Sequence, residues 1–235
     1  MEPAKRKVRR PPAPFDLGEA LRRAERYRSQ RRIRKAIRTY EEILSVDPRN
    51  ADVHIRIAPL YIRTGRKDRA KASLRLATAW YEKRGFVDKA IATLRLIVTI
   101  DRRDLASCLH LADLYLERGL AGDARVLLEQ ARRAFSGWKY RDEALKIEEK
   151  ILALDPDDFR VQCYRARLLW SVGRRREALD RLQQMEEEWF RKGNRGHWRK
   201  TRLVLFRLAP SLSAGRDYLL SLVTSPVPLR PLRGS

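Results

Sequence analysis

The chain repeats itself at a fixed period of 54 residues. The segments 32–85, 86–139 and 140–193 align without an insertion or a deletion, and eight positions hold the same residue in all three. Sequences that repeat at a fixed length fold into stacked units, each of which buries its apolar face against its neighbours. We therefore expect a scaffold that acts by presenting a surface rather than by catalysing a reaction. The identical positions are Ala36/Ala90/Ala144, Ile43/Ile97/Ile151, Asp47/Asp101/Asp155, Ala58/Ala112/Ala166, Leu60/Leu114/Leu168, Gly65/Gly119/Gly173, Ala70/Ala124/Ala178 and Leu74/Leu128/Leu182.

Each unit has the pattern of three α-helices. In the first unit, apolar residues recur in three stretches at the spacing of one helix face. Asp47-Pro48 should end the first helix, because the residue before a proline is pushed out of helical geometry. Gly65 should end the second helix in a left-handed conformation, and Pro59 inside that helix should kink it or remove one backbone hydrogen bond. The three helices are expected at 35–46, 51–65 and 66–85.

Small and aromatic residues also follow a shorter, 34-residue pattern of two helices. Residues 105–138 fit it well, with Ala112, Tyr115 and Gly119 at the expected places. This pattern resembles the tetratricopeptide repeat family, and the resemblance extends over residues 17–193. It implies an all-α fold, a right-handed superhelical solenoid of antiparallel helices built here from three 54-residue units of three helices, plus caps.

The alanines that mark second helices are spaced alternately by 34 and 20 residues. A spacing of 20 leaves no room for a separate first helix. The helices at 67–84 and 121–136 should therefore each serve as the second helix of one motif and the first helix of the next. With strict antiparallel stacking, equivalent helices of successive units should then lie on opposite layers.

The repeat pattern decays after residue 193, where Trp198 takes the place of Ala36. Terminal repeats are usually atypical because they cap the stack. Both ends of the chain are rich in proline and arginine, which is typical of disorder. We predict a disordered basic tail at 1–15, a helical repeat domain at 16–193, capping helices at 194–224 and a disordered Pro/Arg tail at 225–235.

The formal net charge is +23, and most of it comes from arginine. Such a field attracts nucleic acid, anionic lipid and acidic proteins, so it limits the partners without choosing among them. No stretch approaches the ~18 apolar residues of a membrane-spanning helix. We expect a bacterial, cytoplasmic protein, in which Cys108 and Cys163 are small buried hydrophobes inside helices.

Residues that carry chemistry are scarce in the sequence. His54, His110 and His197 have no cysteine or acid at metal-ligand spacing, so we interpret them as structural surface residues. No glycine-rich phosphate loop, nucleophile elbow or metalloprotease motif occurs. The sequence therefore predicts a protein without catalytic activity, cofactor or metal site.

The resemblance also implies a binding groove, because members of the family bind extended or helical peptides along their first helices. Here these helices are expected at 51–64, 105–118 and 159–172. Their variable, outward positions are candidates for partner binding, since the buried columns stay constant while these diverge. The candidates are Arg56, Arg63, His110, Asp113, Glu117, Arg160, Tyr164, Arg167 and Trp170.

Three basic clusters form a second candidate surface, for phosphate groups or other anions. The cluster at 195–202 interleaves an aromatic residue with basic ones, a composition that can stack bases and neutralise phosphates. An ordinary solvated face in an arginine-rich chain has the same composition. The residues of this second surface are Arg31, Arg32, Arg34, Lys35, Arg174, Arg175, Arg176, Trp198, Arg199, Lys200 and Arg202.

The sequence leaves three functions open. The first is a non-enzymatic adaptor that binds an acidic or amphipathic segment of a partner protein in its groove. The second is a helical-repeat protein that binds RNA or DNA through its basic clusters. The third is an accessory module of an enzyme complex that contributes no catalytic residue.

Overall fold

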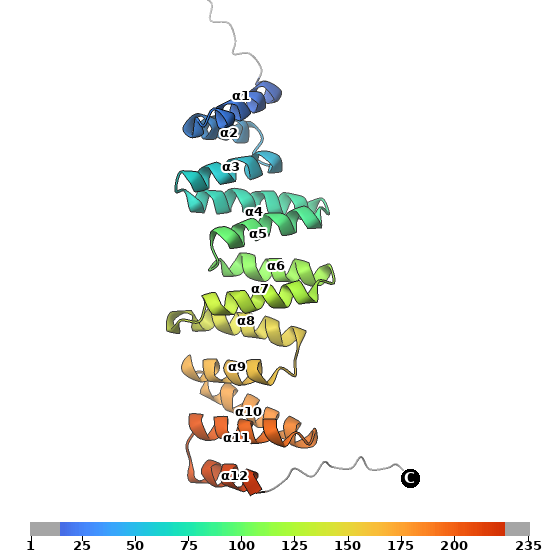
Figure 1. The fold of residues 1–235 in the computed structure, drawn as a ribbon, viewed down its shortest axis with the longest axis vertical. Coiled ribbons are helices and arrows are strands. Elements are labelled where there is room, and N and C mark those ends of the chain that lie inside the picture. Colours follow the sequence, from blue (N-terminus) through green and yellow to red (C-terminus); the bar gives the residue numbers. More distant parts are fainter. Residues whose placement is uncertain (1–14, 224–235) are drawn as a thin grey trace, which may run out of the picture. The chain divides into compact units, whose positions relative to one another are not determined.

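The fold was analysed in a computed structural model of the chain, which describes residues 15–223. These residues form twelve α-helices and one short 3-10 helix, so the predicted all-α class is confirmed (Figure 1). The contacts divide the chain between Ile100 and Asp101 into two units. The tails predicted at 1–15 and 225–235 lie outside the described residues, except for Phe15.

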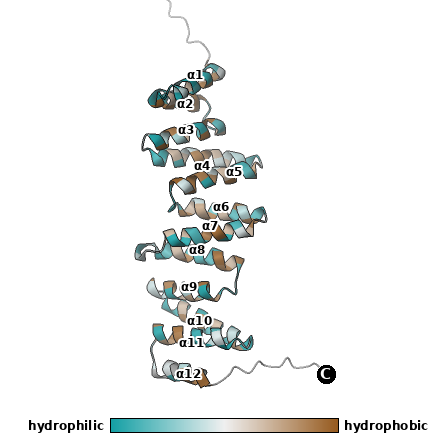
Figure 2. Ribbon diagram, viewed as in Figure 1, coloured by the Kyte–Doolittle hydropathy of each residue, from teal (hydrophilic) through white to brown (hydrophobic). Residues whose placement is uncertain are grey.

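The first unit contains five helices, each packed against the next one in the chain. Its core is formed by side chains such as Tyr40, Ile57 and Leu94, which are at most 2% exposed. Every helix carries both hydrophilic and hydrophobic residues (Figure 2), as expected for helices that bury one face. The helices are α1 (Leu17–Ser29), α2 (Ile33–Val46), α3 (Ala51–Arg63), α4 (Lys67–Lys83) and α5 (Val87–Ile100).

The second unit contains seven α-helices, again packed in chain order. Helices two apart also touch, α6 with α8 and α9 with α11, as expected when alternate helices share a layer. The placement of equivalent helices such as α6 and α9 on opposite layers stays a prediction. The elements are α6 (Leu105–Glu117), α7 (Ala121–Ala134), η1 (Trp138–Tyr140), α8 (Arg141–Leu154), α9 (Phe159–Ser171), α10 (Arg175–Arg191), α11 (Arg195–Leu208) and α12 (Leu212–Val223).

The repeated alanines are buried in the helical stack. All nine alanines at the three identical alanine positions are at most 1% exposed. Two helices can approach to about 8–10 Å only where the side chains at the crossing are small. The identical leucine and isoleucine columns fill the space around these crossings. The nine are Ala36, Ala58, Ala70, Ala90, Ala112, Ala124, Ala144, Ala166 and Ala178.

Tyrosine hydroxyls tie consecutive helices of the first unit to carboxylates. Tyr40 on α2 donates to Glu25 on α1 at 2.7 Å, and Tyr61 on α3 donates to a glutamate of α2 at 2.9 Å. Tyr81 on α4 donates to Asp52 on α3 at 3.2 Å. Burial and the bound carboxylate together raise the pKa of Tyr40 to about 12 and that of Tyr61 to about 12. Each tie fixes one helix against the one before it.

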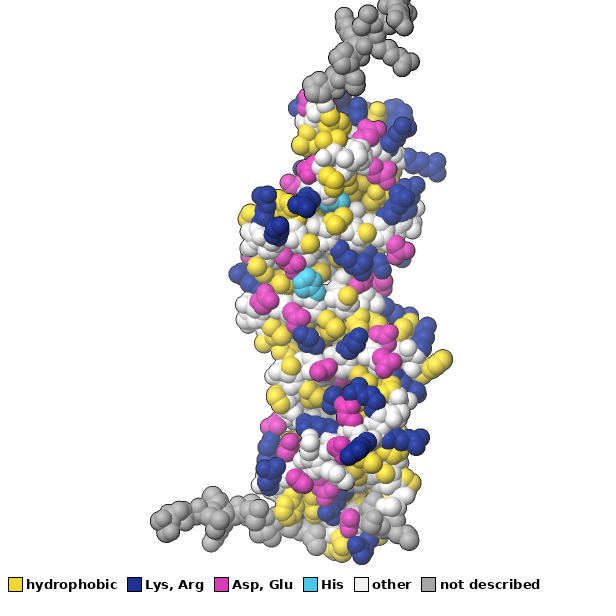
Figure 3. Space-filling view, turned by 180° about the vertical axis from the view of Figure 1, so that it is seen from behind, with side chains coloured by type: hydrophobic (Ala, Val, Ile, Leu, Met, Phe, Trp, Pro, Cys, Tyr) yellow, Lys and Arg dark blue, Asp and Glu magenta, His cyan; other side chains and the backbone are white. Residues whose placement is uncertain are grey.

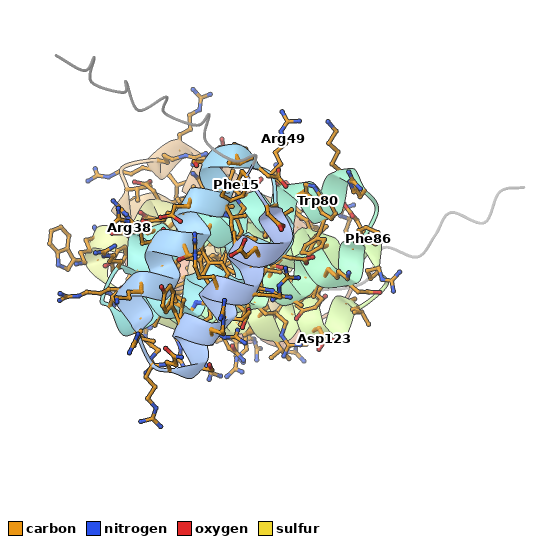
Figure 4. All side chains as sticks on the ribbon, turned by 90° about the horizontal axis from the view of Figure 1, so that it is seen from above. Phe15, Arg38, Arg49, Trp80, Phe86 and Asp123 are labelled. Atoms are coloured by element: carbon orange, nitrogen blue, oxygen red, sulfur yellow. The ribbon has the colours of Figure 1, made fainter. Side chains whose placement is uncertain are left out.

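An aromatic and cationic cluster forms around the turn between α4 and α5. The rings of Trp80 and Phe86 stack with centroids 6.3 Å apart, and both residues are labelled in Figure 4. The Arg84 guanidinium lies 4.3 Å from the Trp80 ring, within the range of a cation–π contact. These contacts connect the C-terminal part of α4 to the residue that precedes α5.

Glycine ends the helices where the sequence predicted it. Gly65, Gly119 and Gly173 have φ angles of 77°, 72° and 86°, the left-handed conformation that glycine adopts without steric cost. The predicted end of the first helix at Asp47 is also confirmed. Pro59 does not break α3, which runs from Ala51 to Arg63. The side chain of Pro59 is exposed, and α3 continues despite the one backbone hydrogen bond that proline removes.

One turn uses arginine instead of glycine. Arg31 has a φ of 56° and stands one period before Gly85, whose φ is 73°. A side chain in this conformation costs about 1–2 kcal/mol, because its Cβ crowds the following carbonyl oxygen. The turn between α1 and α2 therefore stores strain that its counterpart after α4 does not.

Relief of this strain is expected in the variant Arg31→Gly, whose free energy of unfolding should rise by about 1 kcal/mol. The matched control is Arg38→Gly, an exposed arginine in the interior of α2, which should lose about 1 kcal/mol because glycine weakens a helix interior. Urea denaturation followed by circular dichroism measures both. Equal losses in the two variants would contradict the strain argument.

The C-terminal helices form as predicted, but α12 lacks the polar outer face typical of a cap. Leu219 is 62% exposed and Val223 is 80% exposed. Both side chains line an apolar hollow of about 790 Å³ together with Phe206 of α11. The role of 194–224 as a cap therefore stays a prediction.

None of the helices in the described part of the chain is long and apolar enough to cross a lipid bilayer.

Candidate partner-binding groove

The second unit contains a groove between α7 and α9 that is lined by four arginines. Its volume is about 370 Å³. Three lining residues come from the C-terminal end of α7 and the turn that follows it, and four come from α9. The residues are Arg132, Arg133, Ser136, Arg160, Cys163, Tyr164 and Arg167.

The α9 side of the groove follows from helical spacing. Arg160, Tyr164 and Arg167 are four and three residues apart, so they lie along one face of the helix. Asp158 caps this helix, and its Oδ1 accepts the backbone N–H of Val161 at 3.1 Å. The cap fixes the start of α9, and thereby the position of this helix face in the groove.

An ion pair attaches the start of α9 to α7. Arg125 of α7 donates to Asp158 at 2.5 Å. Burial disfavours the charged form of Asp158, but the bonds from Val161 and Arg125 outweigh it and hold the pKa of this carboxyl below its usual value. The two walls of the groove are therefore joined by a contact that stays ionised at neutral pH.

The groove carries positive charge that its own walls do not compensate. Within residues 15–223, the exposed side chains of Arg133, Arg160 and Arg167 make no ion pair. Arg132 differs, because its guanidinium bonds to Glu129 at 2.9 Å and lies 6.0 Å from the ring of Tyr164. Three free guanidinium groups around one hollow can bind carboxylate or phosphate groups through bidentate hydrogen bonds.

Cys163 forms part of the groove wall as a buried thiol. It is 8% exposed, and burial raises its pKa to about 11, against the opposing effect of Arg167 and Lys200. Cys108 on α6 is 1% exposed, and burial raises its pKa to about 11 as well. Both thiols are free, so the prediction of small buried hydrophobes is confirmed.

The predicted partner-binding residues are divided between the two units. Arg160, Tyr164 and Arg167 line the groove, whereas Arg56 and Arg63 lie on α3 in the first unit. Arg56 is already paired with a glutamate of α1 at 2.8 Å, and Arg63 is an exposed residue at the end of its helix.

The remaining predicted residues lie outside the groove lining. Asp113 of α6 bonds to Lys150 of α8, and His110 and Glu117 are exposed residues of α6. Trp170 packs partly into the core formed by residues such as Leu169. The prediction grouped these positions because they occupy equivalent first helices; that they bind one partner stays a prediction.

The α7 residues of the groove were missed, although the sequence held a signal for them. Arg132, Arg133 and Ser136 lie in or just after a helix that was not among the three from which the candidate residues were chosen. The alternating alanine spacing had already indicated that this helix also serves as the first helix of the next motif. Had this double role been used when the candidate residues were chosen, α7 would have been included.

The prediction that Trp198 contributes to an anion-binding surface is wrong. Trp198 is 3% exposed and packs with Met185 in the core, because it fills the space that an alanine occupies in the regular units. Arg202 lies 4.6 Å from its ring and donates to Glu186 at 2.6 Å. Arg199 donates to two carbonyls near the end of α12 at 2.5 Å each. These side chains hold α10, α11 and α12 together.

The other predicted basic residues stay at the surface. Arg31, Arg32, Arg34 and Lys35 surround the turn between α1 and α2, and Lys35 lies 5.8 Å from a tyrosine ring. Near the start of α10, one arginine pairs with a glutamate and another lies over the Trp170 ring. Figure 3 shows basic side chains interspersed with acidic and apolar ones on the face that it presents. The exposed residues near α10 are Arg174, Arg175 and Arg176, and Lys200 is exposed on α11.

The histidines differ from the prediction at one position. His54 is 4% exposed rather than at the surface, and its Nε2 lies 3.0 Å from the carbonyl oxygen of Pro48. Gln162, which stands two periods later, makes the corresponding contact to Pro156. His197 stacks on a phenylalanine ring at 4.2 Å, and burial lowers its pKa. In the described residues, no three His, Cys, Asp or Glu side chains gather as metal ligands would.

Comparisons with known proteins agree with this helical pattern. The family model described as Tetratricopeptide repeat matches residues 16–85. A search of curated proteins gives no match.

Solved structures that are similar share little sequence with the chain. A tetratricopeptide repeat protein from Parabacteroides merdae is 12% identical, with 88% of this chain and 98% of that chain covered and a TM-score of 0.26. The MamA protein is 15% identical, with coverage of 83% and 96% and a TM-score of 0.27. The tetratricopeptide domain of P58(IPK) is 16% identical, with coverage of 83% and 67% and a TM-score of 0.26.

The family match lies on α1 to α4, and the fixed period carries the same alanine, glycine and leucine columns to residue 193. Residues 16–85 of this chain are therefore similar to the tetratricopeptide repeat family.

Proposed function

We propose that the chain is a non-enzymatic adaptor that binds an acidic segment of a partner protein in the groove between α7 and α9. Tetratricopeptide repeats generally mediate protein–protein interaction, which agrees with this proposal. The observation that carries it is the convergence of Arg133, Arg160 and Arg167, none of them ion-paired within the described residues, on one hollow.

The chemistry of the lining favours an acidic peptide over other ligands. Arginine and a carboxylate match as two parallel hydrogen bonds, and charged interactions at a concave, partly dehydrated surface exceed those on an open face. The ring of Tyr164 adds an apolar contact for the stem of an aspartate or glutamate. Burial of Trp198 removes the aromatic residue that had favoured stacking on bases.

Charge reversal in the groove tests the proposal. The probe is a short rhodamine-labelled oligoaspartate peptide, and binding is measured by fluorescence anisotropy. The double variant Arg160→Glu with Arg167→Glu should weaken binding about a hundredfold, since each charged hydrogen bond contributes about 1.5–3 kcal/mol and 1.4 kcal/mol is tenfold. Circular dichroism checks that the variant is folded.

The matched control reverses two exposed arginines outside the groove. Arg34→Glu with Arg176→Glu has the same change in net charge and should alter binding by no more than about threefold, because neither arginine lines the groove and exposed charges are screened by salt. Equal weakening in both double variants would mean that net charge alone attracts the peptide. A single-stranded oligonucleotide that binds more tightly than the peptide, with a steep dependence on salt, would favour the nucleic-acid function instead.

A further inference from the structure

A buried glutamate lies behind the groove. Glu148 of α8 is 0% exposed, and neither of its carboxylate oxygens has a hydrogen-bond partner among the described residues. The nearest cation is Arg132, whose Nη1 lies 3.7 Å from Glu148 Oε2, beyond hydrogen-bonding distance. A charged carboxylate that is buried without hydrogen bonds is costly, so this side chain holds a proton more firmly than an exposed glutamate does.

The charged groups that act on Glu148 come from two neighbouring elements. On α7, Arg132 favours the charged carboxylate and Glu129 disfavours it, and Asp158 at the start of α9 also disfavours it. Burial is the largest influence, and together they raise the pKa of Glu148 to about 7. Glu148 is therefore divided between its neutral and charged forms near neutral pH.

Arg132 connects this carboxyl to the groove. The guanidinium lines the hollow, bonds to Glu129 at 2.9 Å and faces Glu148 from the other side. An acidic group that enters the groove adds negative charge beside Arg132. A nearby like charge disfavours the charged form of a carboxyl, so occupation of the groove must stabilise neutral Glu148.

We propose that Glu148 takes up a proton from solvent when an acidic segment occupies the groove, so that binding strengthens as the pH falls from about 8 to about 6. The inference rests on the proposed function of the groove and adds a regulation to it. The sign follows from charge: at lower pH Glu148 is neutral, Arg132 keeps one acidic neighbour instead of two, and the groove is more positive. A displacement of the pKa by about one unit corresponds to about tenfold between the fully protonated and fully ionised limits, so binding should be about fivefold tighter at pH 6 than at pH 8.

The test compares the wild-type protein with two variants of α8. Binding of the oligoaspartate probe, which stays ionised in this range, is measured at pH 6, 7 and 8 and constant ionic strength. Glu148→Gln should bind at pH 8 as tightly as the wild type does at pH 6, with no pH dependence. Glu149→Gln removes an exposed carboxyl from the next position of the same helix and should keep the wild-type profile.

Proton uptake gives an independent readout. Calorimetric titration at pH 7 in two buffers of different ionisation enthalpy should show a net uptake of protons by the wild type and Glu149→Gln, and none by Glu148→Gln. Zero uptake by the wild type, or a pH dependence that survives in Glu148→Gln, would overturn the inference. If Glu148→Gln does not fold, Glu148→Met replaces it, since it has a similar volume and no charge.

The two proposals fail in different ways. Tight binding without pH dependence refutes the role of Glu148 and leaves the groove's function standing. Absence of peptide binding in the wild type at every pH refutes the groove's function and this inference with it.

Discussion

Leu128→Ala is expected to lower the free energy of unfolding by about 2–5 kcal/mol. Leu128 is 0% exposed in α7 and occupies a register where leucine recurs in all three units, as Leu74 and Leu182. The loss combines the transfer free energy of the removed methyl groups with the cost of the cavity that they leave. In a stacked array this cavity opens at the contact between neighbouring helices, which is the main source of stability.

The matched control is Val126→Ala on the same helix. Val126 is 58% exposed, and its truncation should change the free energy of unfolding by less than about 0.5 kcal/mol. Urea denaturation followed by circular dichroism at 222 nm, a standard helix signal, measures both variants. Similar losses in the two variants would mean that α7 does not bury the predicted face.

Glu148 should make the stability of the protein depend on pH. The pKa of its carboxyl is about 7 in the folded chain, whereas an unfolded glutamate has an ordinary pKa of about 4.3. Between these values the unfolded chain has released the proton that the folded chain still holds. The free energy of unfolding attributable to this residue therefore falls as the pH rises from about 4 to about 7, and is constant above that range.

The expected size of this effect is about 3 kcal/mol, since one pKa unit corresponds to 1.36 kcal/mol. Glu148→Gln should remove it, so the difference in stability between variant and wild type should change by that amount between pH 5 and pH 8. The measurement is urea denaturation at several pH values, with Glu149→Gln as the exposed control. Parallel pH profiles for Glu148→Gln and the wild type would show that the buried carboxyl does not titrate abnormally.

Much of the fold could be predicted from the sequence because its signals are local. The helix ends at Asp47 and Gly65 depend on neighbouring residues and backbone geometry alone, and both were confirmed. The buried alanine columns followed from repetition, since an identical small residue at every period indicates a repeated crossing. The strained turn at Arg31 was not predicted, because the strain is evident only from the positive φ angle that Arg31 shares with its counterpart, Gly85.

Less of the groove could be predicted, because it depends on contacts between residues far apart in the chain. Arg160 and Arg167 were identified as candidates, but their companions Arg132 and Arg133 come from a helix about thirty residues earlier. Glu148 resembles any charged residue of an amphipathic helix, and only the packing of α7 and α9 against α8 shows that it is buried.

The tyrosine ties between α1, α2, α3 and α4 have a consequence for selectivity. Glu25, Glu41 and Asp52 each hold a phenol of the following helix, and Glu25 and Glu41 also hold arginines. A carboxylate has about four acceptor sites, and in each of these three a phenol from the following helix already occupies one of them. A polyamine or a lysine-rich tail that binds one of these carboxylates would have to compete with a hydrogen bond that joins two helices. The acids that hold the helices in place therefore also disfavour the binding of cations to this part of the molecule.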